Sequence, residues 1–137
     1  MKFKLLIIAF IVLFSCKEES RESIEDRVKN QIALVNSSKE YSDMAVKVMN
    51  SGDEGIVERN RIESFEELMK KALSDAEKVD TDLLNDMRKG FGTNFSEKYI
   101  KGIKLQLESF QDGNAKKMVR GQILYDEYVD WTSKNLN

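Results

Sequence analysis

Hydrophobic residues in the middle of the chain recur at alternating steps of three and four, and this spacing constrains the fold more than any other feature. The residues that follow it are Ile62, Phe65, Met69, Ala72, Ala76, Val79 and Leu83. Such spacing places these side chains on one face of an α-helix, as in the seam of a coiled coil. A helix with one apolar face buries it against other elements, so the sequence predicts a domain built by helix packing.

This seam is expected to lie on one long helix with a weak point at Asp80. An earlier helix is predicted to begin near Ser20 or Ser23, with a kink or short break at residues 36–38, because Asn and Ser compete for backbone hydrogen bonds. The glycine-containing stretch 52–55 is typical of a turn and separates the two helices.

Two more helices are predicted in the second half of the chain. A turn at residues 90–94 precedes the third helix, which opens at Asn94, and a turn at residues 112–114 leads to the fourth helix from Ala115. The chain contains no proline, so nothing forbids long helices. The predicted fold class is all-α: a four-helix up-and-down antiparallel bundle that follows an N-terminal signal helix.

The N-terminus has the layout of an export signal. Lys2 and Lys4 precede an unbroken apolar run at residues 5–14, and the small residue Ser15 then leads to Cys16 and a charged stretch. A membrane-spanning helix needs about 20 apolar residues. The run is too short for that purpose, so the sequence favours a secretory signal.

Leu13, Ser15 and Cys16 resemble the lipobox of bacterial lipoproteins, although Phe14 is larger than the residue usual at its position. The resemblance implies cleavage before Cys16 and acylation of that residue, which would anchor the protein to a membrane through its acyl chains. Cys16 is the only cysteine of the chain. An unpaired cysteine in an exported protein otherwise needs an intermolecular partner or a reactive role, and lipidation removes that need.

The residues after the cysteine, Lys17, Glu18 and Glu19, resemble the signal that sends lipoproteins of the Bacteroidota to the outer face of the outer membrane. The alternative is a solvated spacer. The expected location is the outer membrane, on its periplasmic or its cell-surface face. The expected division is a signal peptide at 1–15, an acylated cysteine and charged tether at 16–22, and one helical-bundle domain at 23–137.

The composition argues against several classes of function. Removal of the signal takes Lys2 and Lys4 from the 22 basic residues and none from the 24 acidic ones, which leaves a net charge of −4 and no basic excess for nucleic acid. Without histidine, the usual zinc sets and Ser-His-Asp catalysis cannot form. The acidic cluster near Asp82 lacks an EF-hand glycine loop. We therefore expect no metal, no cofactor and no enzymatic activity.

Gly102 and Gly121 lie inside helical patterns, where glycine costs about 0.8 to 1 kcal/mol relative to alanine. Glycine permits a close approach of two backbones. One interpretation is tight packing between the third and fourth helices. The other is a groove, floored by these glycines, for a small apolar ligand.

Aromatic residues are the best candidates for recognition, because Tyr and Trp combine apolar area with a polar tip. Five of them, Tyr99, Phe110, Tyr125, Tyr128 and Trp131, lie in the last two helices. Leu124, Tyr128 and Trp131 fall to one side of the main apolar stripe of the fourth helix and can hardly all be buried, so they form the predicted partner-binding surface. The methionines, by contrast, are expected to fill the core.

The leading hypothesis is therefore a lipid-anchored, non-enzymatic helical module that binds a protein or another component of the envelope. An immunity-type protein that neutralises a toxin is a special case of it. The alternative hypothesis is a binder of a small apolar ligand between the helices.

Overall fold

The structure is a computed structural model that describes residues 2–51 and 58–136, with side chains from Ile24 to Ser51 and from Asn60 to Leu136. Within these ranges every regular element is a helix and no strand occurs, so the all-α prediction is confirmed. The elements in order are α1 (Lys2–Asn50), α2 (Glu58–Ala76), α3 (Thr81–Met87), α4 (Phe91–Asn94), the π-helix η1 (Phe95–Ile100), α5 (Lys101–Asp112) and α6 (Ala115–Asn135).

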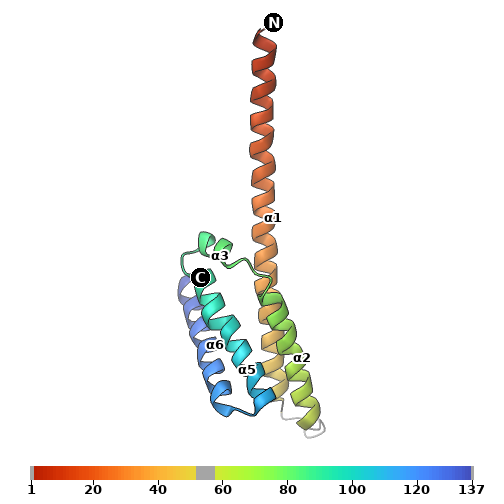
Figure 1. The fold of residues 1–137 in the computed structure, drawn as a ribbon, viewed down its shortest axis with the longest axis vertical. Helices are drawn as coiled ribbons and strands as arrows, with labels where there is room; N and C mark the ends of the chain where they lie inside the picture. Colours follow the sequence, from red (N-terminus) through yellow and green to blue (C-terminus); the bar gives the residue numbers. More distant parts are fainter. Residues whose placement is uncertain (1, 52–57, 137) are drawn as a thin grey trace. The chain divides into compact units, whose positions relative to one another are not determined.

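The chain divides into two units, Met1–Ile32 and Ala33–Asn137. The described part of the first unit is a stretch of α1 alone. In the second unit, the rest of α1 lies alongside α2, α5 and α6, as Figure 1 shows. The core of this unit is aromatic and aliphatic, and its largest fully buried apolar side chains are Tyr99, Phe95, Met69, Leu84 and Ile103.

The predicted seam does face this core. Phe65, Met69, Ala72 and Ala76 are buried, whereas charged neighbours such as Glu67 are exposed. Burial of one helical face stabilises the fold by removing apolar surface from water.

The break predicted at residues 36–38 is wrong, because α1 continues through it to Asn50. Ser37 donates to the Asp75 carboxylate at 2.8 Å and Ser38 to the Ala72 carbonyl at 2.6 Å, so both hydroxyls bond to α2 rather than to their own backbone. α1 also begins earlier than predicted, at Lys2. The predicted turn at 52–55 lies outside the described residues.

The prediction of one helix through Asp80 is also wrong. α2 ends at Ala76, and α3 begins at Thr81 after a short turn. Asp80 has an extended backbone, and its side chain accepts a hydrogen bond from the Leu83 amide at 3.0 Å. It therefore acts as an N-cap, which favours a new helix start over continuation of the old one.

The third predicted helix begins one turn earlier than Asn94, at Phe91. Gly90 has a φ of 85°, a left-handed conformation that favours glycine. The Asn94 side chain donates to the Gly90 carbonyl at 2.8 Å instead of capping a helix. The chain then passes through η1 into α5, so a wider helical turn interrupts this element.

The turn predicted at residues 112–114 and the helix start at Ala115 are confirmed. Gly113 has a φ of 68°, and the Asn114 side chain accepts from the Lys116 amide at 3.1 Å. This short turn brings α6 back along α5 and sets the two helices in contact.

Candidate functional site

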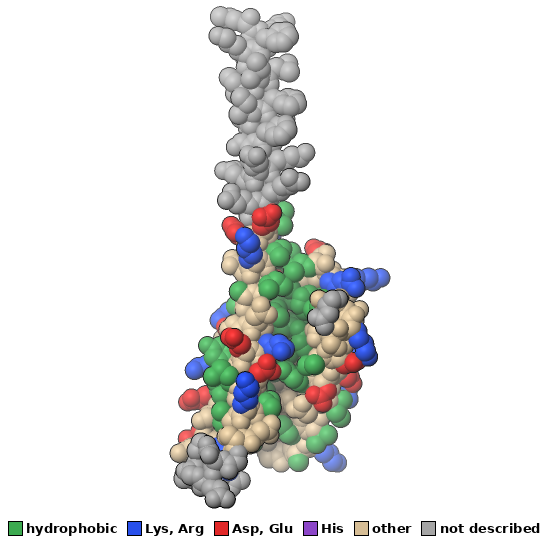
Figure 2. Space-filling model, turned by 180° about the vertical axis from the view of Figure 1, so that it is seen from behind, with side chains coloured by type: hydrophobic (Ala, Val, Ile, Leu, Met, Phe, Trp, Pro, Cys, Tyr) green, Lys and Arg blue, Asp and Glu red, His purple; other side chains and the backbone are tan. Residues whose placement is uncertain are grey.

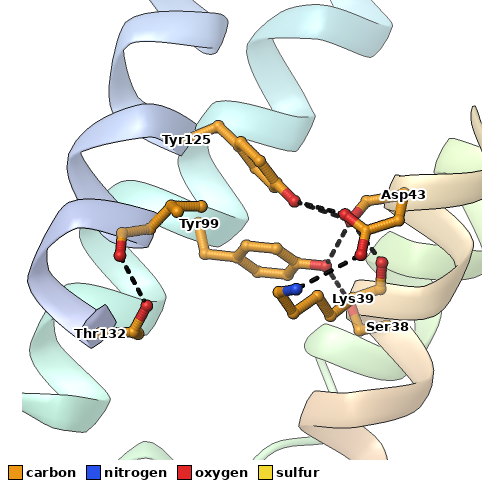
Figure 3. Close-up of polar contacts among 8 residues, drawn as sticks. Ser38, Lys39, Asp43, Tyr99, Tyr125 and Thr132 are labelled. Atoms are coloured by element: carbon orange, nitrogen blue, oxygen red, sulfur yellow. Dashed lines mark hydrogen bonds and ion pairs between the residues drawn. The ribbon is translucent and has the colours of Figure 1, made fainter. Parts of the chain in front are cut away.

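Buried hydroxyl groups meet where α1, α2, η1 and α6 come together. Ser38 and Ser42 are almost fully buried on α1, and Tyr99 reaches them from η1. The Tyr99 hydroxyl lies 2.9 Å from Ser38 Oγ and 3.3 Å from Ser42 Oγ. Figure 3 shows the Tyr99 and Tyr125 side chains pointing toward this part of α1.

Each hydroxyl hydrogen of this cluster has an acceptor. Ser38 donates to the Ala72 carbonyl, and Ser42 donates to the Lys39 carbonyl at 2.8 Å. Tyr99 therefore shares its single hydroxyl hydrogen between Ser38 Oγ and Ser42 Oγ, and Tyr125 donates to the Asp43 carboxylate at 3.0 Å. Among the described residues, no buried side-chain nitrogen or oxygen lacks a partner. The cluster joins α1, α2, η1 and α6 through satisfied hydrogen bonds.

The tyrosines of this region are held in their neutral form. Burial raises the pKa of Tyr99 above its usual value, against the lowering effect of its bonds to Ser38 and Ser42. Burial likewise raises the pKa of Tyr125 and of Tyr128, and the negative charge of Asp43 adds to the effect on Tyr125. At neutral pH these hydroxyls are donors and acceptors of hydrogen bonds, not anions.

The same tyrosines form a layer of packed aromatic rings. The ring of Tyr99 lies 5.0 Å from that of Phe95, 5.1 Å from that of Tyr128 and 5.8 Å from that of Tyr125, measured between centroids. These separations are typical of favourable aromatic pairs. The ring layer therefore belongs to the core of the domain. The buried hydroxyl cluster belongs to the same core.

Gly102 and Gly121 do not floor a groove. A Cβ atom on Gly102 would lie 2.9 Å from the Gly121 carbonyl oxygen, and one on Gly121 would lie 2.7 Å from the Gly102 carbonyl oxygen. The backbones of α5 and α6 fill the space that a ligand would need. Tight helix packing is the correct interpretation of the two glycines, and the predicted ligand groove is wrong.

The predicted partner-binding surface is wrong for two of its three residues. Leu124 is 5% exposed and Tyr128 is 3% exposed. Both lie on the same face of α6 as Gly121, three and seven residues further on. This face packs against α5 at Gly121. Trp131 is half-buried, and its ring stacks on that of Phe91 at 6.1 Å between centroids.

Two of the exposed apolar side chains of α6 lie on the side of the helix opposite to Gly121. Val119 is 60% exposed and Ile123 is 42% exposed. They share this side with charged residues at helical spacing. We define the outer face of α6 as Lys116, Val119, Arg120, Ile123, Glu127 and Asp130. Figure 2 shows one face of the molecule, on which hydrophobic side chains lie among both signs of charge.

Three methionines expected in the core are instead exposed: Met44, Met49 and Met87. The first two lie on the part of α1 near its end, and Met87 ends α3. Only Met69 of the predicted set is fully buried, so methionine at an apolar helical position did not guarantee burial here.

The predicted export and lipidation residues, Cys16, Lys17, Glu18 and Glu19, belong to α1 by their backbone, and their side chains lie outside the described residues. No helix in the described part of the chain combines the length and the apolar character needed to cross a membrane. The described residues also contain no group of three or more acidic, cysteine or histidine side chains suited to hold a metal ion.

The sequence prediction missed the burial of Ser38 and Ser42, although the helical spacing of their neighbours indicates it. Val35, Ser38, Ser42 and Ala45 follow one another at steps of three and four, which places both serines on the apolar face. By residue type alone, Ser38 reads only as a poor helix former. The periodicity was the better guide, because Tyr99 and the Ala72 carbonyl bond to the serine hydroxyl.

Comparison with known proteins finds no family model, no curated protein and no solved structure that matches this chain.

Proposed function

We propose that this chain is a lipid-anchored lipoprotein of the outer membrane, and that its helical domain is a non-enzymatic module for binding a protein or another component of the envelope. The observation that carries the proposal is the order of features at the N-terminus: basic residues, an apolar run, Ser15, and then the only cysteine of the chain. In this proposal residues 1–15 are removed, Cys16 is acylated, and residues 16–22 tether the domain 23–137.

Two or more acyl chains hold a protein stably on a membrane, whereas one chain gives reversible binding. A lipoprotein of this type carries its anchor at the first residue of the mature chain. The absence of any other cysteine in the sequence fits a protein whose single thiol is consumed by lipidation.

In the same proposal, the domain is a four-helix antiparallel bundle. Its helices are α2, α5, α6 and the part of α1 that belongs to the second unit. The short turn at Gly113 and the bonds from Ser37 and Ser38 to α2 support this arrangement. The polar groups inside such a bundle are hydrogen-bonded to one another, so we expect its surface to bind the partner.

The outer face of α6 is the surface we assign to the partner. Val119 and Ile123 are large apolar side chains exposed one turn apart, with charged residues around them. An apolar centre within a polar rim is the usual composition of a protein interface. We assign the partner to this face instead of to the surface predicted at Leu124 and Tyr128, because those two side chains are buried.

The anchor is tested by a Cys16→Ala substitution in the full chain. We expect the substituted protein to leave the membrane fraction and to lose incorporation of a labelled fatty acid, because the acceptor thiol is gone. A Ser20→Ala chain is the matched control and should stay on the membrane. Continued anchoring and labelling of Cys16→Ala would show that the lipoprotein assignment is wrong.

The binding surface is tested by placing a photo-cross-linking amino acid at position 123 of the full chain in intact cells. We expect a discrete adduct from this position and none from Gln111, which is exposed on α5. Val119→Ser should reduce the adduct, because it removes apolar contact area one turn away. Equal adducts from both positions would contradict the assignment of this face.

A further inference from the structure

The charges on the outer face of α6 are arranged in an unusual order. Its first turn contains no acidic residue, and Lys116 and Arg120 precede Glu127 and Asp130. The helix dipole favours acidic residues near the N-terminus and basic residues near the C-terminus. Apart from Lys134 in the last turn, the order on this face is the reverse, so Lys116, Arg120, Glu127 and Asp130 do not stabilise the isolated helix through its dipole.

The basic half of this face has no partner within the described part of the chain. No side-chain ion pair is formed there by Lys116 or Arg120. The acidic half is only partly used: Glu127 contacts Lys98 at 3.1 Å through one carboxylate oxygen, and Asp130 contacts Lys134 at 2.7 Å through one oxygen. The second oxygen of each carboxylate remains able to accept from another cation.

Arg120 cannot reach Glu127 along its own helix. Seven residues of α-helix span about 10 Å, well beyond the length of an ion pair. A helix that runs in the opposite direction can bring these two residues together. If Ile123 is opposite Ile123 of the second helix, Lys116 comes opposite Asp130, and Arg120 comes within one residue of the position opposite Glu127.

We propose that the outer face of α6 binds the same face of a second copy of this chain, with the two α6 helices antiparallel about a two-fold axis at Ile123. Arg120 then pairs with the partner's Glu127, and Lys116 pairs with the partner's Asp130. Ile123 packs against the partner's Ile123, with Val119 beside it. The inference rests on the proposed function in taking this face as a docking surface, and it names the occupant.

The charge order favours a second copy over an unrelated partner. A two-fold interface requires a surface that is complementary to itself after rotation, so that residue i contacts j and j contacts i. Lys116 and Asp130 lie seven residues on either side of Ile123, and Arg120 and Glu127 lie three and four residues from it, so the face meets that requirement to within one residue, about 1.5 Å along the helix. Antiparallel helices also place each basic N-terminal half beside the negative end of the other helix dipole. Parallel helices would place like charges together.

The proposal is tested by cysteine cross-linking of the full chain. Ile123→Cys places a thiol at the proposed axis, and mild oxidation should produce a disulfide-linked dimer. The unsubstituted chain, whose only cysteine is Cys16, gives the background. Gln111→Cys, exposed on α5, is the matched control and should not exceed that background. Dimer from Ile123→Cys no more abundant than from Gln111→Cys would overturn the proposal.

Charge reversal in the Ile123→Cys chain tests the direction of the helices. Arg120→Glu alone and Glu127→Arg alone should each reduce the cross-linked fraction by about tenfold, because attraction becomes repulsion at two symmetric contacts. The double substitution should restore the dimer only if the helices are antiparallel. Singles that lose the dimer without rescue by the double variant would contradict the model of pairing. Circular dichroism checks that every variant remains helical.

Failure of the dimer proposal can be distinguished from failure of the proposed binding function. A photo-adduct with a different protein at position 123, in a chain that forms no dimer, would overturn self-association and leave the binding module intact. Loss of both the adduct and the dimer would contradict both proposals.

Discussion

The Tyr99 hydroxyl is removed from water when the protein folds, and two serines of α1 take the place of the water. A buried hydroxyl without a partner costs more than the bond itself contributes, because its desolvation is then uncompensated. Ser38 and Ser42 therefore determine whether a tyrosine can occupy this position. Since these residues lie about sixty positions from Tyr99, helical spacing can indicate their face, although the prediction did not use it, but it cannot indicate their partner.

Tyr99→Phe tests the contribution of the hydroxyl, because it removes both hydrogen bonds and keeps the ring. We expect the free energy of unfolding to fall by about 1 to 2 kcal/mol. Urea unfolding followed by the fluorescence of Trp131, the only tryptophan, measures it. Tyr41→Phe is the control, because the Tyr41 ring is only half-buried on α1. Equal effects of the two substitutions would contradict a specific role of the Tyr99 bonds.

Asp75 makes stability depend on pH at one position. The hydrogen bond from Ser37, and after it that from Lys78, lowers the pKa of Asp75 below its usual 3.8. Because the pKa is lower in the folded state, the stabilisation is complete above pH 3.8 and is lost as the pH falls through the folded-state pKa. Ser37→Ala should raise the pKa of Asp75, as measured by NMR titration of its carboxyl group. An unchanged titration would contradict this bond.

At the scale of elements, the contact between α5 and α6 depends on two glycines that face each other. Each lies against the carbonyl oxygen of the other, so the backbones approach more closely than side chains allow. The sequence indicated this contact, because glycine inside a helix needs a reason. The π-helix was not predicted, although Phe95, Tyr99, Ile103 and Leu107 follow at steps of four, which a regular α-helix cannot keep on one face.

Gly121→Ala should lower the free energy of unfolding by about 1 to 3 kcal/mol, because the added methyl group collides with the Gly102 carbonyl and the Gln106 side chain. Helix propensity alone predicts the opposite sign, a gain of about 1 kcal/mol. Thermal unfolding measured by circular dichroism decides between them. A stabilised variant would show that the two helices are not held in contact at this point.

At the scale of the whole molecule, hydrophobic periodicity was sufficient to predict an all-α fold and four of its helical segments. It failed where a polar side chain changes role with its surroundings. Asp80 could continue a helix or cap a new one, and Tyr128 could lie outside or inside according to how α6 rotates on Gly121. Contacts between helices decide the roles of Asp80 and Tyr128, and a single sequence does not specify those contacts.

The division at Ile32 has a consequence for proteolysis of the full chain on membranes. Hydrogen bonds within a helix are local, so the first unit can open without disturbing the core of the second. Brief trypsin treatment should therefore cut before Ala33, for example after the exposed Lys29, and release a fragment that resists further cleavage. Mass spectrometry of the released fragment identifies the site. First cuts within α2 or α5 would contradict this expectation.

The π-helix η1 couples the length of the chain to the rotation of a helix. Each residue turns an α-helix by about 100°, so the loss of one residue from Phe95–Ile100 would turn everything after it by that angle relative to what precedes it. Either Tyr99 would leave its serines, or Gly102 would leave Gly121. Natural relatives of this chain should therefore conserve the number of residues in this segment more strictly than their identity.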